Sequence, residues 1–583
     1  MRNDVWKELL VRERMKENAR VDCGDGVTLE RGVRCHLSDG VVLLSDHYYA
    51  AGVEPHPTLL MRQPYGRDIA STVVYAHPVW FARQGYNVVI QDVRGRGGSE
   101  GEFYPFRHEG RDGAETIAWL RTRPECNGRI GMYGFSYQGA TQLLAAAERP
   151  EGLQCIAPAM TACDLYRGWF YHHGALRLAS TLGWGLQMLK EDARRLGLRE
   201  ASARLETAWT NVRAQAAYVP YAEHPAITDP ELPSYVRDWF EHDAPGHYWS
   251  AMDVSTRAQE IDVPALHVSG WYDTYLEGSV HGFNLLRSKA RSAHARENQF
   301  LLAGPWVHIP WGDRIGDTDL GAEALLDTDA LLLRWFDHWL KDAGSFAKEP
   351  RIRHFAMGTN RWHEAEDISG ETEKAFHLHG GGRAESRKGD GVLSLSAAAN
   401  EPPDVFVYDP EVPVLAPGGV QSLSGPHDQS GLELGNNLLV YTSPSLEQAM
   451  HVFGSPRVVL YTATSAACAD TTAKLVRVLP NGRAEFCCIG IARSTYLFND
   501  DYVADTVHRW EFALEPTSTV FSTGERIRLE IAGCAFPLYD RNPSNATKAS
   551  RMSQWNWERS THRVFHEEGR PSALYLPTIE GGA

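Results

Sequence analysis

The order of apolar and polar positions changes character twice along the chain. Between Val27 and Asp164, short and nearly continuous apolar runs alternate with segments in which apolar residues recur every three or four positions. The first pattern is typical of strands buried in a parallel sheet, and the second of helices that cover it. The same alternation returns after Val254. We therefore predict a discontinuous α/β domain built from residues 28–164 and 255–357.

The stretch between these two parts, residues 165–254, contains no clear strand. Prolines at five positions divide it into short segments, which favours a cap of short helices. Its aromatic residues are numerous: Trp169, Phe170, Tyr171, Trp184, Trp209, Trp239, Phe240, Tyr248 and Trp249. We expect most of them to form the core of the cap and a minority to line a substrate pocket.

The remainder of the chain follows a third pattern. Residues 372–583 contain short alternating runs such as DVFVYD and RIRLEIAG, separated by Gly, Pro and Asn turns. This pattern predicts an all-β domain, a two-sheet sandwich or jelly roll. Residues 1–27 mix acidic, basic and isolated apolar residues, which predicts an N-terminal arm.

Composition and charge narrow the functional classes. The 583 residues carry a formal net charge of −16, which argues against nucleic acid and anionic membranes as partners. No apolar run approaches the length of a membrane-spanning helix, and the first residues lack the apolar centre of a signal peptide. Nine cysteines form no CxxC pair, so we expect reduced thiols and a cytoplasmic location.

The chemistry centres on the sequence GMYGFSYQGATQLLAAA around Ser136. Apolar residues before the serine predict a buried strand, and those after it recur at helical spacing. Gly134 and Gly139 flank the serine and permit a close approach of strand and helix. A strand, a sharp turn with a serine at its tip and a helix form the nucleophile elbow of α/β-hydrolases, although the second glycine comes one residue later than in G-x-S-x-G. Ser136 is the candidate nucleophile.

A serine nucleophile needs a histidine base and an acid that orients it. Two strands after the cap supply them: VPALHVSGWYD ends on Asp273, and QFLLAGPWVH ends on His308. The alternatives are less well placed. His267 lies inside its strand, and His281 and His338 lie within predicted helices. Asp262 precedes the strand that ends on Asp273, and Glu277 follows it. We predict the triad Ser136, Asp273 and His308.

Acyl transfer also needs donors for the oxyanion. The backbone N–H of Tyr137, directly after the nucleophile, is one candidate. The Gly-Gly stretch that lipases carry after an early strand is missing, and the corresponding strand runs into Arg62-Gln-Pro-Tyr65. The Tyr65 hydroxyl is the candidate second donor, and simple packing of this tyrosine in a loop is the alternative.

Two other motifs could suggest a cofactor or a metal, but neither has the sequence context that such a site requires. The glycine-rich segment from Asp92 to Ser99 follows a strand, but no helix opens directly after it. We interpret it as a structural loop with Arg94 paired inside the domain, and not as a dinucleotide site. His172 and His173 are adjacent without further ligands in register. We expect no cofactor and no metal.

The chain resembles the cocaine esterase family, the CocE/NonD hydrolases related to X-Pro dipeptidyl peptidases and α-amino-acid ester hydrolases. The resemblance rests on segments that span nearly the whole chain in the family's order: RQPYG, VVIQDVRG, GMYGFSYQGATQ, CDLYRG, SGWYD, GPWVH, FAMGTNRW, YDPEVPV, TTAKLVRVLPNGRA and FPLYDRN. It implies an α/β-hydrolase with a helical cap and a C-terminal jelly roll. It also implies that Ser136, Asp273 and His308 are catalytic and that Tyr65 and the Tyr137 amide form the oxyanion hole.

Departures from the family pattern concern the substrate. Relatives that act on α-amino-acid esters carry extra carboxylates just after the triad aspartate, whereas Thr274, Tyr275 and Leu276 follow here. In cocaine esterase, aromatic residues surround the acyl group. The corresponding positions are Tyr275, Leu423 and either Trp169 or Phe170, so the acyl pocket is expected to differ from that of cocaine esterase.

The leading hypothesis is therefore a serine hydrolase that cleaves small-molecule carboxylic esters. The alternatives are an amidase or X-Pro-type dipeptidyl peptidase with the same triad, and a non-catalytic ligand-binding protein. The sequence does not indicate the oligomeric state, for which a homodimer is one option.

Overall fold

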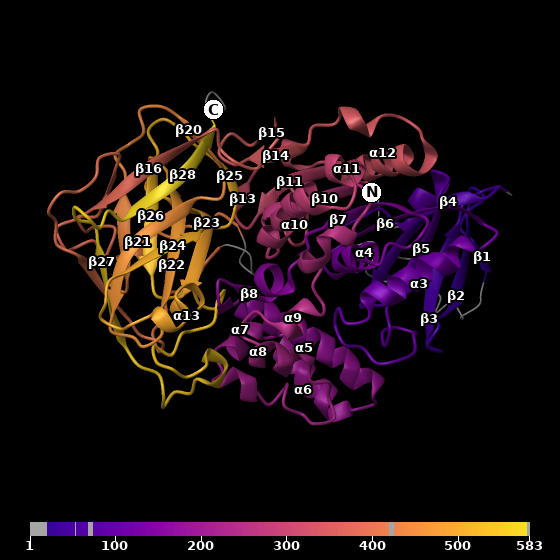
Figure 1. Cartoon of the computed structure of the whole chain (residues 1–583), viewed down its shortest axis with the longest axis horizontal. Helices are drawn as coiled ribbons and strands as arrows, with labels where there is room; N and C mark the ends of the chain where they lie inside the picture. Colours follow the sequence, from indigo (N-terminus) through magenta and orange to yellow (C-terminus); the bar gives the residue numbers. More distant parts are fainter. Residues whose placement is uncertain (1–19, 53, 68–73, 419–424, 580–583) are drawn as a thin grey trace.

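The structure is a computed structural model in which residues 20–52, 54–67, 74–418 and 425–579 are described. It contains an 11-stranded sheet with flanking helices, a helical cap and a β-domain (Figure 1). From one edge to the other the strands of the first sheet are β1 (Arg20–Asp22), β2 (Thr28–His36), β3 (Val42–Tyr49), β5 (Asn87–Asp92), β4 (His56–Gln63), β6 (Cys126–Phe135), β7 (Leu153–Ala159), β10 (Ala265–Tyr272), β11 (Gln299–Val307), β14 (Ile352–Ala356) and β15 (Arg361–Ala365).

The centre of this sheet is parallel and buried on both faces. Pairing is parallel from β5 through β4, β6, β7, β10 and β11 to β14, and antiparallel at both edges. Every residue of β5 and β10 is buried. Alternate residues of β5 enter different cores, because Val88 and Ile90 join one apolar cluster and Val89 the other. The near-continuous apolar runs of the sequence arise from this two-sided burial.

Helices cover both faces. The helices α3 (Glu109–Arg121) and α4 (Tyr137–Ala147) contribute to one cluster, and α2 (Pro78–Arg83) and α12 (Thr328–Lys341) to the other. The sheet is wider than the predicted domain, because β1 precedes residue 28 and β15 follows residue 357. Residues 1–19 of the predicted N-terminal arm lie outside the described residues.

The cap is helical, as its aromatic and proline pattern suggests (Figure 1). Its helices are α5 (Leu178–Arg195), α6 (Arg199–Trp209), α7 (Val212–Ala216), α8 (Tyr235–Glu241) and α9 (His247–Ser250). The sequence shows no strand here, yet a small hairpin joins β8 (Tyr171–His172) to β9 (Ala175–Leu176). Two-residue strands are too short to leave a periodic signal. A π-helical turn, η2 (Tyr166–Phe170), precedes the hairpin.

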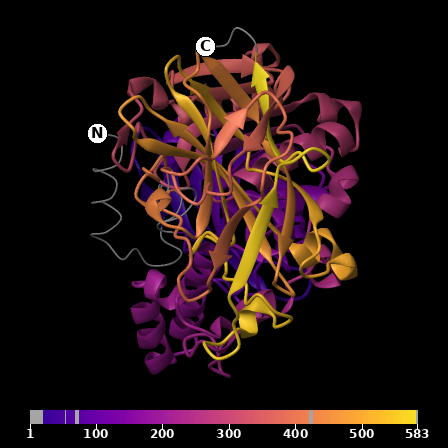
Figure 2. The same cartoon turned by 90° about the vertical axis from the view of Figure 1, so that its left-hand side faces the viewer.

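The C-terminal domain is all-β, as predicted. Its 13 strands form one hydrogen-bonded network and are β16 (Thr372–His379), β17 (Val392–Ser394), β18 (Asp404–Tyr408), β19 (Leu438–Thr442), β20 (Met450–Gly454), β21 (Arg457–Thr464), β22 (Asp470–Val478), β23 (Ala484–Arg493), β24 (His508–Ala513), β25 (Thr517–Phe521), β26 (Arg526–Ala532), β27 (Ser560–Phe565) and β28 (Ala573–Ile579). They enclose an apolar core of their own. Figure 2 shows this domain in front of the α/β domain and the cap.

The β-domain contacts both the α/β domain and the cap. At the α/β domain, His354 of β14 lies 2.9 Å from the Ser518 hydroxyl of β25, and Met357 bridges to Thr519. At the cap, the His173 ring nitrogen Nδ1 lies 3.0 Å from the carbonyl oxygen of Ile491 in β23. A shared apolar cluster fills the junction. The cap hairpin therefore lies between the sheet that carries the candidate nucleophile and the β-domain.

Candidate active site

Ser136 occupies a sharp turn between β6 and α4. Its φ and ψ are 61° and −128°, a strained combination for a residue with a side chain and typical of functional turns. Only 6% of the serine is exposed. A Cβ on Gly139 would lie 2.7 Å from the Thr161 methyl group, and one on Gly134 would lie 2.5 Å from Gln138. Both glycines are therefore required for the close packing of strand and helix, including the late one.

Asp273 and His308 meet at the same edge of the sheet. They follow the neighbouring parallel strands β10 and β11, whose carboxyl ends point in one direction. The His308 Nδ1 atom lies 2.6 Å from Asp273 Oδ1. Asp273 is completely buried, whereas the His308 side chain is 29% exposed. The ring of Phe135, the residue before Ser136, lies 5.5 Å from the His308 ring. The fold thus gathers the three predicted triad residues at one edge.

Tyr65 lies beside Ser136, after the end of β4. Burial raises the pKa of the Tyr65 hydroxyl and outweighs the opposing effect of the nearby polar groups of Trp184 and Ser136, so that the pKa is about 12. The phenol therefore stays protonated and can donate a hydrogen bond. Tyr137 is the first residue of α4, so its backbone N–H has no acceptor within the helix. Its side chain points elsewhere and donates to Glu109 at 2.8 Å.

Three of the four predicted pocket residues lie in an aromatic cluster. The ring of Tyr275 lies 5.3 Å from that of His308 and stacks on Trp169 at 4.1 Å. Phe170 instead packs on Trp239 and Trp249 in the cap core. Of this pair, Trp169 is therefore the residue that packs against the ring next to His308, a choice which the sequence had left open. Leu423 lies outside the described residues.

Two of the alternatives to the predicted triad residues, His267 and Asp262, interact with other parts of the α/β domain. His267 is buried inside β10 beside Gln299, and burial lowers its pKa to about 4. Asp262 is exposed and accepts a hydrogen bond from the backbone of Ser292. Arg94 of the glycine-rich loop pairs with Asp112 at 2.8 Å, in agreement with its structural interpretation.

The fold adds a third potential ligand to His172 and His173. Glu277 of α10 (Leu276–Lys289) lies close enough that one ligand atom from each residue falls within 4.8 Å of the others. However, Arg167 and Arg177 bind its two carboxylate oxygens at 2.8 and 3.1 Å. Burial alone would raise the pKa of Glu277, but His172 and Arg177 outweigh it and lower the pKa to about 2. A divalent cation would have to compete with two guanidinium groups, so we interpret the cluster as an ion-pair network.

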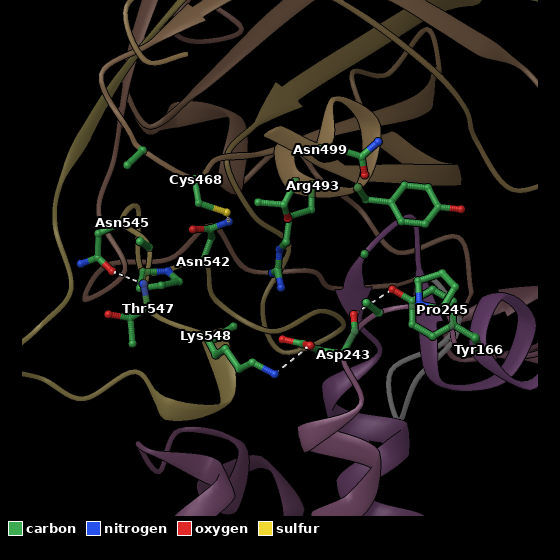
Figure 3. Close-up of a pocket in the computed structure, with 18 residues that line it drawn as sticks. Tyr166, Asp243, Pro245, Cys468, Arg493, Asn499, Asn542, Asn545, Thr547 and Lys548 are labelled. Carbon is green, nitrogen blue, oxygen red and sulfur yellow. Dashed lines mark hydrogen bonds and ion pairs between the residues drawn. The ribbon is translucent and has the colours of Figure 1, made fainter. Parts of the chain in front are cut away.

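A cavity of about 530 Å³ lies between the cap and the β-domain (Figure 3). Among the residues that the structure describes, none of those predicted for the triad, the oxyanion hole or the acyl pocket lines it. Its charged groups are already paired, because Lys548 binds Asp243 at 3.1 Å and Arg493 binds Asp470 and Asp540. This cavity is therefore separate from the candidate active site.

Residues 39–310 match the X-Pro dipeptidyl-peptidase (S15) family, and residues 344–575 match the C-terminal non-catalytic domain of X-Pro dipeptidyl-peptidases. Cocaine esterase from Rhodococcus sp. is 32% identical over an alignment of 567 residues, which covers 93% of this chain and 97% of that protein. The chain belongs to the S15 family. This confirms the predicted relationship to cocaine esterase and X-Pro dipeptidyl peptidases.

Two solved structures have the same fold over nearly the whole chain. An aminopeptidase from a marine-sediment Thaumarchaeota archaeon superposes with a TM-score of 0.80 at 23% identity, covering 97% of this chain and 99% of its own. An α-amino acid ester hydrolase superposes with a TM-score of 0.77 at 22% identity, covering 97% and 98%. The predicted α/β fold with a C-terminal all-β domain is therefore confirmed.

Trp184 was not selected as a site residue from the sequence. It lies in α5, and its indole N–H is close enough to the Tyr65 hydroxyl to lower the pKa of that phenol. Arg177 was also not selected: it links Glu277 of α10 to Glu515 of the β-domain, at 3.1 and 2.9 Å. Neither residue has a local sequence signal, because its neighbours in the fold are distant along the chain.

Proposed function

We propose that the protein hydrolyses carboxylic esters of small molecules through an acyl-enzyme on Ser136. The proposal rests chiefly on one observation: His308 binds a fully buried Asp273 at 2.6 Å, at the edge where Ser136 sits on a strained turn. A buried carboxylate fixes the imidazole and stabilises the cation that forms when the imidazole accepts the serine proton. Membership of a family that includes a cocaine esterase supports ester chemistry.

The reaction follows from these positions. Ser136 Oγ attacks the ester carbonyl and gives its proton to His308 Nε2, which then protonates the leaving alcohol. The carbonyl oxygen becomes an oxyanion that accepts hydrogen bonds from the Tyr65 hydroxyl and the Tyr137 backbone N–H. Water, deprotonated by His308, then attacks the acyl-enzyme and releases the carboxylic acid. In this scheme Trp169 and Tyr275 border the acyl group.

Amide or X-Pro dipeptide hydrolysis is the second candidate, because the matching family is described as an X-Pro dipeptidyl-peptidase. A dipeptidyl peptidase must bind the ammonium group of its substrate, for which a free carboxylate near the triad is suited. Glu277, the first acid after Asp273, is already bound by Arg167 and Arg177. This pairing favours ester over dipeptide substrates.

A comparison of kcat/KM for p-nitrophenyl esters and for aminoacyl-proline amides tests this choice. We expect turnover of the esters and little or none of the amides, and the reverse ranking would establish the peptidase. Labelling of Ser136 by a fluorophosphonate, absent in Ser136→Ala, separates both enzymes from a ligand-binding protein. Ser136→Ala should also lower turnover by several orders of magnitude with the fold intact.

We further propose a cytoplasmic location. All nine cysteines are free, and most of them are buried in the domain cores, as expected in a reducing compartment. In addition, no helix among the described residues is long and apolar enough to cross a bilayer. Fractionation of the native host, with detection of the protein in the cytosolic fraction, tests the location directly.

A further inference from the structure

A second pocket, about 520 Å³ in volume, lies wholly within the β-domain. Arginines are its only charged lining residues in the part of the chain that the structure describes: Arg387, Arg526 and Arg528. The whole protein carries a formal net charge of −16. The three arginines that line the pocket therefore differ in sign from the net charge of the protein.

Strand geometry brings two of these arginines together. Arg526 and Arg528 are two positions apart on β26, so their side chains leave the same face of the sheet. Arg528 stands opposite Thr442 of β19, and Arg526 stands opposite Val478 of β22. The third arginine arrives on the loop that follows β16, where the backbone N–H of Arg387 donates to the Glu433 carbonyl at 2.9 Å.

The guanidinium group of Arg528 is held in one orientation and keeps one nitrogen available for a ligand. Its side chain is only 9% exposed. Its Nε donates to the Thr442 hydroxyl at 2.9 Å, and its Nη1 pairs with the buried carboxylate of Glu433. These two contacts hold the guanidinium plane in place. Its remaining nitrogen, Nη2, makes no hydrogen bond within the described chain, so a positioned N–H donor is left over.

The other two arginines are exposed and have no acidic partner among the described residues. Arg526 donates only to the backbone carbonyl of Ser443, at 3.4 Å, and the Arg387 side chain makes no hydrogen bond or ion pair there. By contrast, Glu525, the neighbour of Arg526, faces away and binds the Ser522 backbone. The lining also includes the hydroxyls of Ser386 and Ser445.

We propose that this pocket binds the anionic end of a small molecule, a phosphate or a carboxylate group. Guanidinium groups bind such oxygens through paired N–H donors, and three of them can surround one anionic group. The volume exceeds the needs of a single phosphate group, so the ligand carries further atoms beyond its anionic end. The pocket is formed by the β-domain alone and is independent of the proposed esterase activity.

Isothermal titration of the full-length protein with inorganic phosphate, citrate and AMP tests the proposal. Sodium chloride keeps the ionic strength constant, because screening alone changes weak anion binding. We expect saturable binding of at least one probe. The preferred probe identifies the source of the charge: citrate for a carboxylate ligand, AMP for a phosphorylated organic ligand and inorganic phosphate for the free anion.

The decisive variant is Arg387→Gln/Arg526→Gln, which changes two exposed side chains. Loss of two charge-assisted contacts should weaken binding by roughly tenfold or more. The matched control is Arg509→Gln/Arg563→Gln, which removes the same charge from exposed arginines elsewhere in the domain, and its affinity should stay within about twofold of wild type. The melting temperatures and ester turnover of both variants report whether the fold is retained.

Absence of saturable binding to all three probes would overturn the proposal. An equal loss of anion affinity in the control variant would also overturn it, because the binding would then depend on the net charge of the protein and not on the pocket. If the double variant were unstable, Arg387→Gln alone would serve, and unchanged affinity in that stable variant would exclude Arg387 from the site.

Discussion

The indole of Trp169 lies parallel to the phenol ring of Tyr275, with 4.1 Å between ring centroids and 23° between the planes. The Tyr275 ring is in turn nearly perpendicular to the His308 ring, with 5.3 Å between centroids and 82° between the planes. Both aromatic side chains are almost completely buried, with 2% and 5% exposure. The space next to His308 is thus filled by a stacked pair. In the proposed reaction, an acyl group must fit beside this pair or displace it.

This stack predicts a preference for small acyl groups. Tyr275→Ala removes one ring and opens the space beside His308. We expect the ratio of kcat/KM for p-nitrophenyl benzoate to that for p-nitrophenyl acetate to rise roughly tenfold, a difference typical of a changed apolar pocket. Tyr275→Phe keeps the ring and serves as the control. An unchanged ratio in the alanine variant would mean that the acyl group lies elsewhere.

The pairing of Asp273 with His308 predicts a large effect on turnover. Asp273→Asn keeps the size of the side chain but replaces the charge that orients the imidazole. We expect kcat to fall by about 10⁴-fold, as for the loss of a triad aspartate in other serine hydrolases, with little change in melting temperature. Asp262→Asn alters an exposed acid outside this pair, and its kcat should equal that of wild type. Comparable losses in both variants would contradict the assignment of Asp273.

Tyr65→Phe deletes only the hydroxyl beside Ser136. Because charge develops on the carbonyl oxygen in the transition state, we expect kcat to fall about 10²–10³-fold while KM changes little. The melting temperature should remain close to that of wild type, since the ring and its packing are retained. Steady-state kinetics with one ester substrate measure both parameters. A near-wild-type kcat would leave Tyr65 with a packing role and place the second donor elsewhere.

Chelation should not affect ester hydrolysis. The His172, His173 and Glu277 cluster is the candidate metal site in the described chain, and Arg167 and Arg177 already bind its carboxylate. Extended treatment with EDTA should therefore leave kcat and KM unchanged. Loss of activity that is restored by zinc would show that the cluster binds a metal which the reaction or the fold requires.

The junction between the α/β domain and the β-domain should weaken in acid. Burial, together with smaller contributions from the neighbouring His451 and His363, lowers the pKa of His354 to about 3. In the unfolded chain this histidine binds a proton below its ordinary pKa of about 6.5. Between pH 6.5 and 3 the unfolded state therefore holds more protons than the folded state, and stability falls as the pH falls.

Thermal unfolding at several pH values tests this relationship. The melting temperature of wild type should decrease between pH 7 and pH 4. In His354→Gln, which retains a side chain able to hydrogen-bond to Ser518, the decrease should be smaller. Several other buried histidines share the lowered pKa, among them His47 and His562, so part of the decrease should persist. An identical decrease in both proteins would exclude His354 as a contributor.

The sequence by itself determined the parts of the protein that follow from local pattern. The two-sided burial of central strands produces continuous apolar runs, which located the sheet and the turn that carries Ser136. The same reasoning selected Asp273 and His308, because side chains at the ends of adjacent parallel strands share one edge. One sequence was also enough to identify the family, because the short motifs of the family occur in the same order along nearly the whole chain.

Only the tertiary structure decided which residues meet when no period or motif connects them. Trp169 stacks on Tyr275 next to His308, whereas Phe170 of the same π-helical turn packs on Trp239 in the cap core. Glu277 joins His172 and His173 only through the packing of the cap hairpin against α10. Arg387 reaches the arginine pair of β26 from a distant loop. In each case the contact joins segments that are far apart in sequence. The local order of apolar and polar residues depends on neighbours along the chain, so it does not indicate such a contact.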